Sequence, residues 1–338
     1  CCNVSCGLAS FVGGGIKNCA IGDSSFVGGG GSLTQPNIAS GSASTVVGGR
    51  LNRACGVCSF VGGGLCNTAS GSASVITGGT NNLALGVCSF IGGGFANRAS
   101  GSASVTIGGA SNIVLGACSA IVGGQFNTGS GDFSFIGGGC NSTTSGNFSF
   151  VGGGCNNTTS GCWSFVGGGC TNNASQNRSA IAGGGSNSAT GILTFIGGGY
   201  GNTSSATYAT IGGGYLNTAS NNYSITAGGR NNTASGVASF IGGGSTNVAS
   251  GACSAIGGGK SNTASAIYSA VNGGKCNTVS SFYSFIGGGT LNTVVNGNVS
   301  TIVGGISNYS SGSRAFIGGG ASNCVTGDCA AIVGGQFN

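Results

Sequence analysis

The chain contains no histidine, no glutamate and no methionine, and its only carboxylate side chains are those of Asp23, Asp132 and Asp328. Without histidine a Ser-His-Asp triad cannot be assembled, and three aspartates so far apart in the sequence provide no paired acid and base. The composition therefore argues against an enzyme. It also leads us to expect no cofactor and no metal site.

Charge is equally scarce. Charged residues make up 4% of the chain, and the nine lysines and arginines behind the net charge of +6 are scattered through the sequence. The sequence therefore contains no basic stripe that could follow a nucleic-acid backbone, and we expect no nucleic-acid partner. Glycines interrupt every apolar run before it reaches membrane-spanning length, so no membrane span is expected either. The missing initial methionine suggests a processed product or a fragment.

Glycine, with 78 residues, is abundant and belongs to a repeat of 15 residues. The phrase Ser-Phe-Ile/Val-Gly-Gly-Gly-x-x-Asn-x-Ala-Ser-Gly-x-x recurs along the chain, and Ser59–Ala73 is a clean copy. Such a short period is typical of a solenoid with one turn per repeat. We therefore predict an all-β parallel β-solenoid (a β-roll) of about 22 coils, as a single repeat domain over residues 1–338 with a rim insertion near 31–36.

Alternation along each strand assigns the side chains to faces. Numbering the repeat from 0 at the Phe, we read positions 13–2 and 6–10 as strands and the glycines of 2–4 as a turn. Positions 14, 1 and 3 then point inward from one strand, and 7 and 9 from the other. We expect the stacked position-7 asparagines to bond their amides to the copies above and below. The predicted core ladder includes Ile76, Ile91, Ile136, Ile196 and Ile241 at position 1 and Asn67, Asn82, Asn97, Asn157 and Asn217 at position 7.

Position 0 must point outward if position 1 points inward, and it is Phe in eleven coils. Position 13 adds further aromatic residues on the same predicted face. Soluble monomers rarely expose a contiguous apolar patch larger than roughly a few hundred Å², so we predict a homo-oligomer. The alternative is a roll wide enough to enclose both positions, which would break the alternation in every coil. The predicted subunit interface comprises Phe60, Phe90, Phe135, Phe150, Trp163 and Phe165.

The spacing Gly-x-x-Asn-x-Ala-x-Gly-x-x-Ser, seen in Gly64–Ser74 and Gly94–Ser104, resembles the head-domain repeats of trimeric autotransporter adhesins and similar Gly-rich repeats of phage and viral fibres. The resemblance implies a left-handed parallel β-roll that assembles as a trimer and attaches to a surface receptor or glycan. Here Asn stands where the family usually has Ser at position 7, and Gly-Gly-Gly replaces its Ala-Ile-Gly.

Seventeen cysteines are too many for a reducing cytosol unless they bind metal, and no CxxC pair has the partners that a zinc site needs. One group shares position 5 in successive coils, about 4.8 Å apart, within the range for a disulfide: Cys140, Cys155 and Cys170. A second group shares position 13 in alternate coils: Cys58, Cys88 and Cys118. These three either pair across a subunit interface or are small buried hydrophobes that exchange with alanine. Disulfides would imply an extracellular setting, on a cell or virion surface.

Asn-x-Ser/Thr triplets are frequent, and Asn147 and Asn222 are the candidate glycosylation sites because they fall at the position-12 turn. In contrast, Asn157, Asn202 and Asn308 occupy the inward position 7.

These patterns predict a structural or adhesive extracellular fibre or filament subunit. The alternatives are an ice-binding β-roll and the binding head of a larger adhesin or viral tail fibre. Threonines at position 8 come closest to the regular array that ice requires, but Arg53, Arg98 and Val248 interrupt them. Both ends of the sequence break off within an ordinary coil without a polar cap. Either flanking sequence covers them or subunits stack head to tail into a filament, which we favour.

Overall fold

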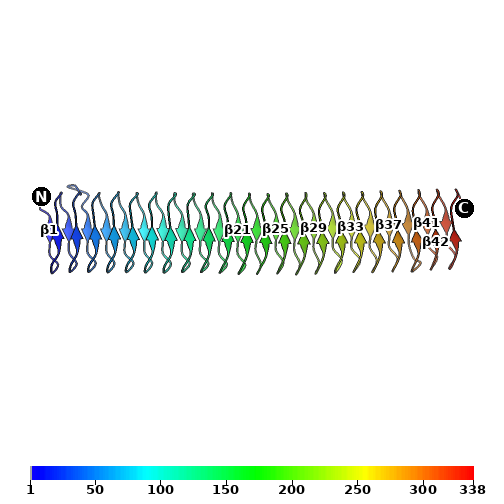
Figure 1. The fold of residues 1–338 in the computed structure, drawn as a ribbon, viewed down its shortest axis with the longest axis horizontal. Helices are drawn as coiled ribbons and strands as arrows, with labels where there is room; N and C mark the ends of the chain where they lie inside the picture. The colour runs from blue at the N-terminus through cyan, green and yellow to red at the C-terminus, as the bar shows by residue number, and fades with distance from the viewer. Residues whose placement is uncertain (1) are drawn as a thin grey trace. The chain divides into compact units, whose positions relative to one another are not determined.

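The computed structural model describes residues 2–338. Over these residues the chain is an all-β parallel β-solenoid of about 22 coils, with roughly 15 residues per turn and no helix, which confirms the predicted fold class. The coils fall into two units, Cys1–Cys170 and Thr171–Asn338, and within each unit successive coils lie side by side (Figure 1). No segment among the described residues forms a helix that could cross a membrane.

Each coil contributes one strand of two residues to each of two parallel sheets. In the first unit the odd-numbered sheet consists of β1 (Val4–Ser5), β3 (Cys19–Ala20), β5 (Ile38–Ala39), β7 (Arg53–Ala54), β9 (Thr68–Ala69), β11 (Leu83–Ala84), β13 (Arg98–Ala99), β15 (Ile113–Val114), β17 (Thr128–Gly129), β19 (Thr143–Thr144) and β21 (Thr158–Thr159). Its even-numbered sheet consists of β2 (Phe11–Val12), β4 (Phe26–Val27), β6 (Thr45–Val46), β8 (Phe60–Val61), β10 (Val75–Ile76), β12 (Phe90–Ile91), β14 (Val105–Thr106), β16 (Ala120–Ile121), β18 (Phe135–Ile136), β20 (Phe150–Val151) and β22 (Phe165–Val166).

The second unit repeats this plan. Its odd-numbered sheet consists of β23 (Asn173–Ala174), β25 (Ser188–Ala189), β27 (Thr203–Ser204), β29 (Thr218–Ala219), β31 (Thr233–Ala234), β33 (Val248–Ala249), β35 (Thr263–Ala264), β37 (Thr278–Val279), β39 (Thr293–Val294), β41 (Tyr309–Ser310) and β43 (Cys324–Val325). Its even-numbered sheet consists of β24 (Ala180–Ile181), β26 (Phe195–Ile196), β28 (Thr210–Ile211), β30 (Ile225–Thr226), β32 (Phe240–Ile241), β34 (Ala255–Ile256), β36 (Ala270–Val271), β38 (Phe285–Ile286), β40 (Thr301–Ile302), β42 (Phe316–Ile317) and β44 (Ala331–Ile332).

Strands pair in register with the strand one coil away, so that equivalent repeat positions stack into columns; Phe135, for example, lies opposite Phe150. Extra residues are absorbed in the connections between strands. Four residues added between β4 and β5 make Cys19 pair with Ile38, and two backbone hydrogen bonds between Ser32 and Gln35, of 3.1 and 3.3 Å, close the resulting loop. The columns therefore continue on both sides of the insertion.

The core is a narrow column of side chains from positions 1, 9, 14 and 7. Position 1 supplies the largest fully buried residues, and burial of each such Ile contributes about 1.5–3 kcal/mol. The members of the predicted core ladder, all 0% exposed, are Ile76, Ile91, Ile136, Ile196, Ile241, Asn67, Asn82, Asn97, Asn157 and Asn217. Because each coil contacts only its neighbours, these contributions accumulate coil by coil.

The buried asparagines bond mainly to the backbone and not, as expected above, to one another. Asn82 donates from Nδ2 to the carbonyl of Gly78 in its own coil and to that of Gly94 in the next, both at 3.1 Å. Its Oδ1 accepts the backbone N–H of Asn97 at 3.0 Å. Amide-to-amide bonds occur only in some coils, such as Asn187 to Asn172 at 3.1 Å. The amide gives the half-buried Gly78 carbonyl a donor and adds a second donor to the Gly94 carbonyl, which also accepts the Thr80 N–H at 2.9 Å.

The predicted strands are too long. Positions 6 and 13 were assigned to strands, but the backbone there is left-handed, with φ of 59° at Cys66 and 55° at Cys58. A coil of this length must reverse direction twice, and these residues make the bends. Left-handed non-glycine residues cost roughly 1–3 kcal/mol each. Bonds between coils offset that cost, since the Cys58 N–H donates to the carbonyl of Ser42 in the preceding coil at 2.9 Å.

The three glycines of the turn are not equivalent. Position 3 was predicted to point inward, but a Cβ placed on Gly63 would meet no atom within 4 Å and would lie in open space. Gly64, at position 4, has φ of +91°, and a Cβ there would overlap the Gly79 carbonyl oxygen of the next coil. Glycine is therefore required at position 4 by backbone conformation and by the stacking of coils.

Alanine substitution should separate these two positions. We expect Gly64→Ala to lower the free energy of unfolding by about 3 kcal/mol, because it adds left-handed strain to a steric overlap. Gly63→Ala should change it by less than about 0.5 kcal/mol. Urea unfolding followed by far-UV circular dichroism measures both, and equal losses would contradict the assignment of faces.

The asparagine ladder gives a second prediction. Asn82→Ala should destabilise the protein by about 3 kcal/mol, because the buried N–H of Asn97 loses its acceptor and two glycine carbonyls lose a donor.

The chain supplies the converse variant. Ser142 replaces Asn at position 7, and its Oγ only accepts the N–H of Asn157, at 3.3 Å. Ser142→Asn should give the Gly138 carbonyl a donor and the Gly154 carbonyl, which already accepts the Cys140 N–H, a second one. This should raise the free energy of unfolding by about 1 kcal/mol. A loss of stability in Ser142→Asn, measured by the same unfolding, would show that the ladder bonds have been misassigned.

Candidate interaction surface

The position-0 side chains lie on the outer face of the even-numbered sheet. They point outward because their neighbours at position 1 fill the core. In the first unit Phe60, Phe90, Phe135 and Phe150 are half-buried, and Phe165 is exposed. The structure thus encloses the side chains of position 1 and leaves those of position 0 outside. The alternative of a wider roll that encloses both positions is wrong.

Three successive coils carry two columns of aromatic rings. At position 0, Phe150 stacks on Phe135 and Phe165 with ring centroids 5.3 and 5.2 Å apart. At position 13, Phe148 stacks on Phe133 and Trp163 at 4.9 and 4.2 Å. We call these six side chains the aromatic patch. Trp163 is 57% exposed, so solvent reaches most of the second column.

The strand positions one column of the aromatic patch, and the turn positions the other. Position 13 is left-handed, with φ of 60° at Trp163, so its side chain leaves the coil at the bend and not from a strand face. Large aromatic side chains bury roughly 150–250 Å² each when they are covered. Six of them in register therefore form a contiguous apolar surface, a feature that marks interaction sites.

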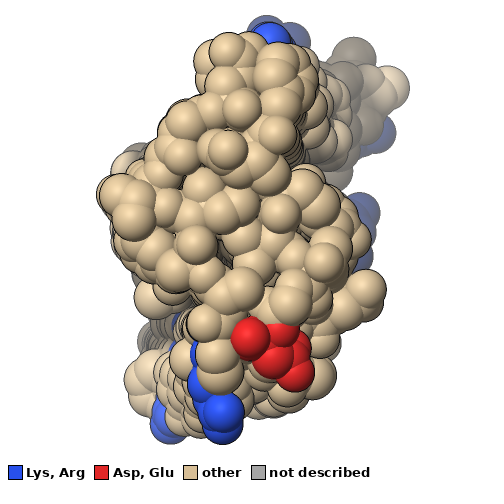
Figure 2. Space-filling model, turned by 90° about the vertical axis from the view of Figure 1, so that its right-hand side faces the viewer, with Lys and Arg blue, Asp and Glu red and all other residues tan. Residues whose placement is uncertain are grey.

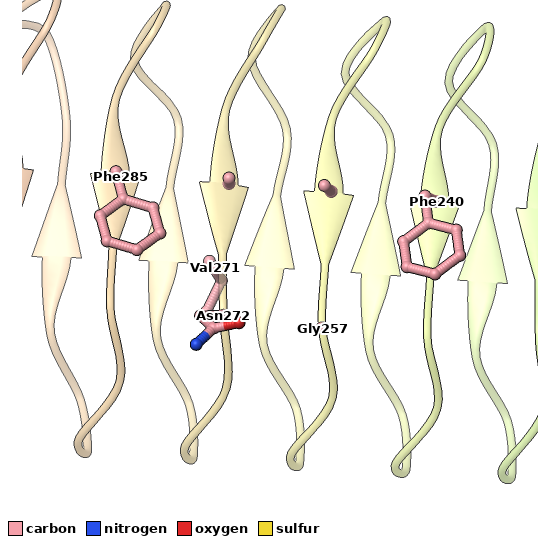
Figure 3. A pocket seen from close by; sticks show the side chains of 7 residues that line it. Phe240, Gly257, Val271, Asn272 and Phe285 are labelled. Atoms are coloured by element: carbon pink, nitrogen blue, oxygen red, sulfur yellow. The ribbon is translucent and has the colours of Figure 1, made fainter.

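In the second unit, small residues interrupt the column of position-0 phenylalanines. Phe240 on β32 and Phe285 on β38 flank Ala255 and Ala270 on the two strands between them (Figure 3). The small side chains leave a hollow of about 240 Å³ above Gly257 and Asn272. Ligand pockets usually measure about 300–1,000 Å³, so this hollow suits a side chain better than a complete small molecule.

The three position-5 cysteines belong to the same coils as the aromatic patch. Cys140 pairs in parallel with Cys155, and Cys155 with Cys170, so the three share one column. Partial burial and the two neighbouring thiols raise the pKa of the Cys155 thiol. Cys140 and Cys155 are thiols in the structure, and a disulfide between neighbours stays a prediction.

The position-13 cysteines are solvent-exposed at the turn. The interpretation of Cys58, Cys88 and Cys118 as small buried hydrophobes is therefore wrong, because a left-handed bend directs their side chains away from the core. Among the described residues no three His, Cys, Asp or Glu side chains are arranged to hold a metal ion.

The three aspartates share one structural contact at position 12, which the sequence did not reveal. Asp23, Asp132 and Asp328 each accept, at 2.8 Å, the backbone N–H of the equivalent residue one coil earlier. Asn147 does the same for the N–H of Asp132 at 2.9 Å. On the face that Figure 2 shows, acidic side chains occupy a single small area of a largely uncharged surface.

The remaining candidate positions lie on the surface or in the core according to their repeat position. Asn147 and Asn222 are exposed, whereas Asn157, Asn202 and Asn308 are fully buried. The position-8 threonines of the second unit stack in register on the odd-numbered sheet, as with Thr203 and Thr218, and Val248 interrupts their column.

No model of a known protein family matches the sequence, and no curated protein matches it either. Of what the resemblance to adhesin head repeats implies, the structure supports only a parallel β-solenoid, here of about 22 turns, and no family is identified.

The ring columns give a third prediction. Phe148→Ala should uncover the stacked ring face of Trp163, the only tryptophan, which is already 57% exposed, and shift its fluorescence emission to slightly longer wavelength. Loss of two ring pairs should also cost about 1–2 kcal/mol of stability. Phe126→Ala, which removes an exposed ring outside the aromatic patch, is the control. An unchanged emission spectrum in Phe148→Ala would contradict the stacking.

Proposed function

We propose that this chain is a structural subunit of an extracellular fibre and that copies of it associate through the aromatic patch. The observation that carries the proposal is the pair of stacked ring columns on three successive coils, which lie on the outside of the coil, half-buried or exposed. An apolar surface of this kind is normally covered by another protein.

A second copy of the chain is the partner that fits this surface best. Every copy carries the same columns at the same coil spacing, about 4.8 Å, so rings of two or three chains can meet in register. No charged side chain belongs to the aromatic patch, and charged residues are only 4% of the chain, so association meets little charge repulsion. The hollow between Phe240 and Phe285 offers space for a side chain of another copy.

The finer features of the proposal come from the resemblance and from composition. Adhesin head repeats are trimeric and attach to surfaces, so we propose a parallel homotrimer with a surface receptor or glycan as a further partner. Seventeen cysteines favour an oxidising setting, on a cell or virion surface. Ice binding is the weaker alternative, because it uses the position-8 threonines and leaves the aromatic patch uncovered.

Two charge substitutions in one coil test the proposal. Phe150→Asp places a carboxylate in the aromatic patch and should shift the protein to smaller oligomers in light scattering and sedimentation velocity. Thr158→Asp, half-buried on the opposite sheet of the same coil, should leave the oligomer unchanged.

The outcomes separate the alternatives. Circular dichroism establishes that both variants keep the β-solenoid. A wild-type protein with the mass of one chain would overturn self-association, and equal dissociation of both variants would show that the aromatic patch is not the contact.

A further inference from the structure

We propose that Cys140, Cys155 and Cys170 form a thiol–disulfide exchange site, in which Cys155 bonds to either neighbour in turn. The third thiol then remains able to form a mixed disulfide with a second chain. The exchange within one chain is independent of the proposed fibre, and only the bond to a second chain rests on it.

The register limits the column to one disulfide. Cys155 is the bridge partner of both Cys140 and Cys170 in adjacent coils. Adjacent coils lie about 4.7–4.9 Å apart, within the range of about 4.4–6.8 Å for Cα atoms of a disulfide. Cys140 and Cys170 are two coils apart, about 9.6 Å, beyond the limit of about 7 Å. Every intrachain bond therefore includes Cys155, whose sulfur can hold only one.

The straight column also suits the exchange reaction. A thiolate attacks a disulfide sulfur from the side opposite the leaving sulfur. Because Cys155 is the middle residue of the column, the Cys170 thiolate would approach a bonded Cys155 from the coil opposite Cys140. Its attack forms the Cys155–Cys170 bond as the Cys140–Cys155 bond breaks, and Cys140 leaves as the thiolate. No net oxidation accompanies this step, and the reverse step is its mirror image.

The first bond requires an oxidant, for which we name a small-molecule disulfide such as oxidised glutathione. One protein thiolate displaces a molecule of thiol from it to give a mixed disulfide. A neighbouring protein thiolate then displaces the second molecule of thiol. Two protein thiols are oxidised in all, and one small disulfide is reduced to two thiols.

Two further observations support the central role of Cys155, one electrostatic and one a hydrogen bond. Partial burial and both neighbouring thiols raise the pKa of Cys155, which makes it the poorer leaving group, so attack at the Cys155 sulfur with departure of Cys140 or Cys170 is favoured. One position further along, Asn141 donates from Nδ2 to Oδ1 of Asn156 at 2.7 Å. That bond ties together the turns that carry Cys140 and Cys155.

The test maps bonds in the folded full chain after incubation with oxidised glutathione. Acid quenching stops exchange, N-ethylmaleimide then caps the remaining thiols, and pepsin cleaves under acid conditions. Pepsin cuts at aromatic residues, and Phe148, Phe150, Trp163 and Phe165 separate the three cysteines. A Cys162→Ser background removes the other cysteine of the middle peptide.

We expect the Cys140–Cys155 and Cys155–Cys170 bonds both to be found, never in one molecule. After the oxidant is removed at neutral pH, their ratio should move to a constant value. Cys155→Ser should abolish intrachain bonding and leave Cys140 and Cys170 as glutathione adducts, whereas Cys140→Ser should keep the Cys155–Cys170 bond. Cys88 is the internal control, because Ala73 and Ala103 occupy its position in the adjacent coils, and it should form only the glutathione adduct.

Three results would overturn the proposal: a Cys140–Cys170 bond within one chain of Cys155→Ser, a single bond whose partner never changes, or all three thiols capped while Cys88 carries glutathione. The same mapping on Phe150→Asp separates the two proposals. If that variant is a monomer that still forms both intrachain bonds, the exchange site is supported independently of the proposed fibre.

Discussion

The hydrogen bonds of the position-7 asparagine are the interaction on which the stack depends. The glycines at positions 3 and 4 have no side chain to fix their own conformation, and the Gly78 carbonyl gains a donor because the Asn82 amide donates back to it. The same amide reaches forward to Gly94, and its oxygen holds the N–H of Asn97. Each asparagine thus closes the turn of its own coil and sets the register of the next, and every column on the surface follows from that register.

The period was sufficient to predict the coil, its parallel stacking and the outward direction of position 0, because strand alternation is a local rule that the stack does not override. The turns could not be predicted in the same way. A bulky residue such as Trp163 is a poor candidate for φ of 60° by its intrinsic preference. It adopts that conformation because backbone bonds to the neighbouring coils leave no alternative, and a single repeat does not contain that information.

Part of the candidate surface could also be predicted from the repeat. Equal repeat positions stack, so the Cys140, Cys155 and Cys170 column could be read from spacing alone. Position 13 was harder, because its residues leave the coil at a bend, and Cys88 is therefore exposed where alternation with alanine suggested burial. The contact between Asp132 and the Ala117 N–H was out of reach, since nothing in one coil shows which backbone groups of the previous coil lack a partner.

In a repeat that stacks equal positions into columns, distinctive side chains gather on a few successive coils and not around one pocket. The coils that carry the aromatic patch also carry the position-5 cysteines, and one of them contains Ser142, the one departure from Asn at position 7. That coil keeps its backbone ladder but makes fewer hydrogen bonds from position 7, because a hydroxyl replaces an amide with two donors. Sulfurs in adjacent coils must move closer than the coil spacing to bond, to about 2.05 Å. Ser142 lies two positions after Cys140, so the coil with the fewest position-7 hydrogen bonds is one in which such movement disturbs fewest of them.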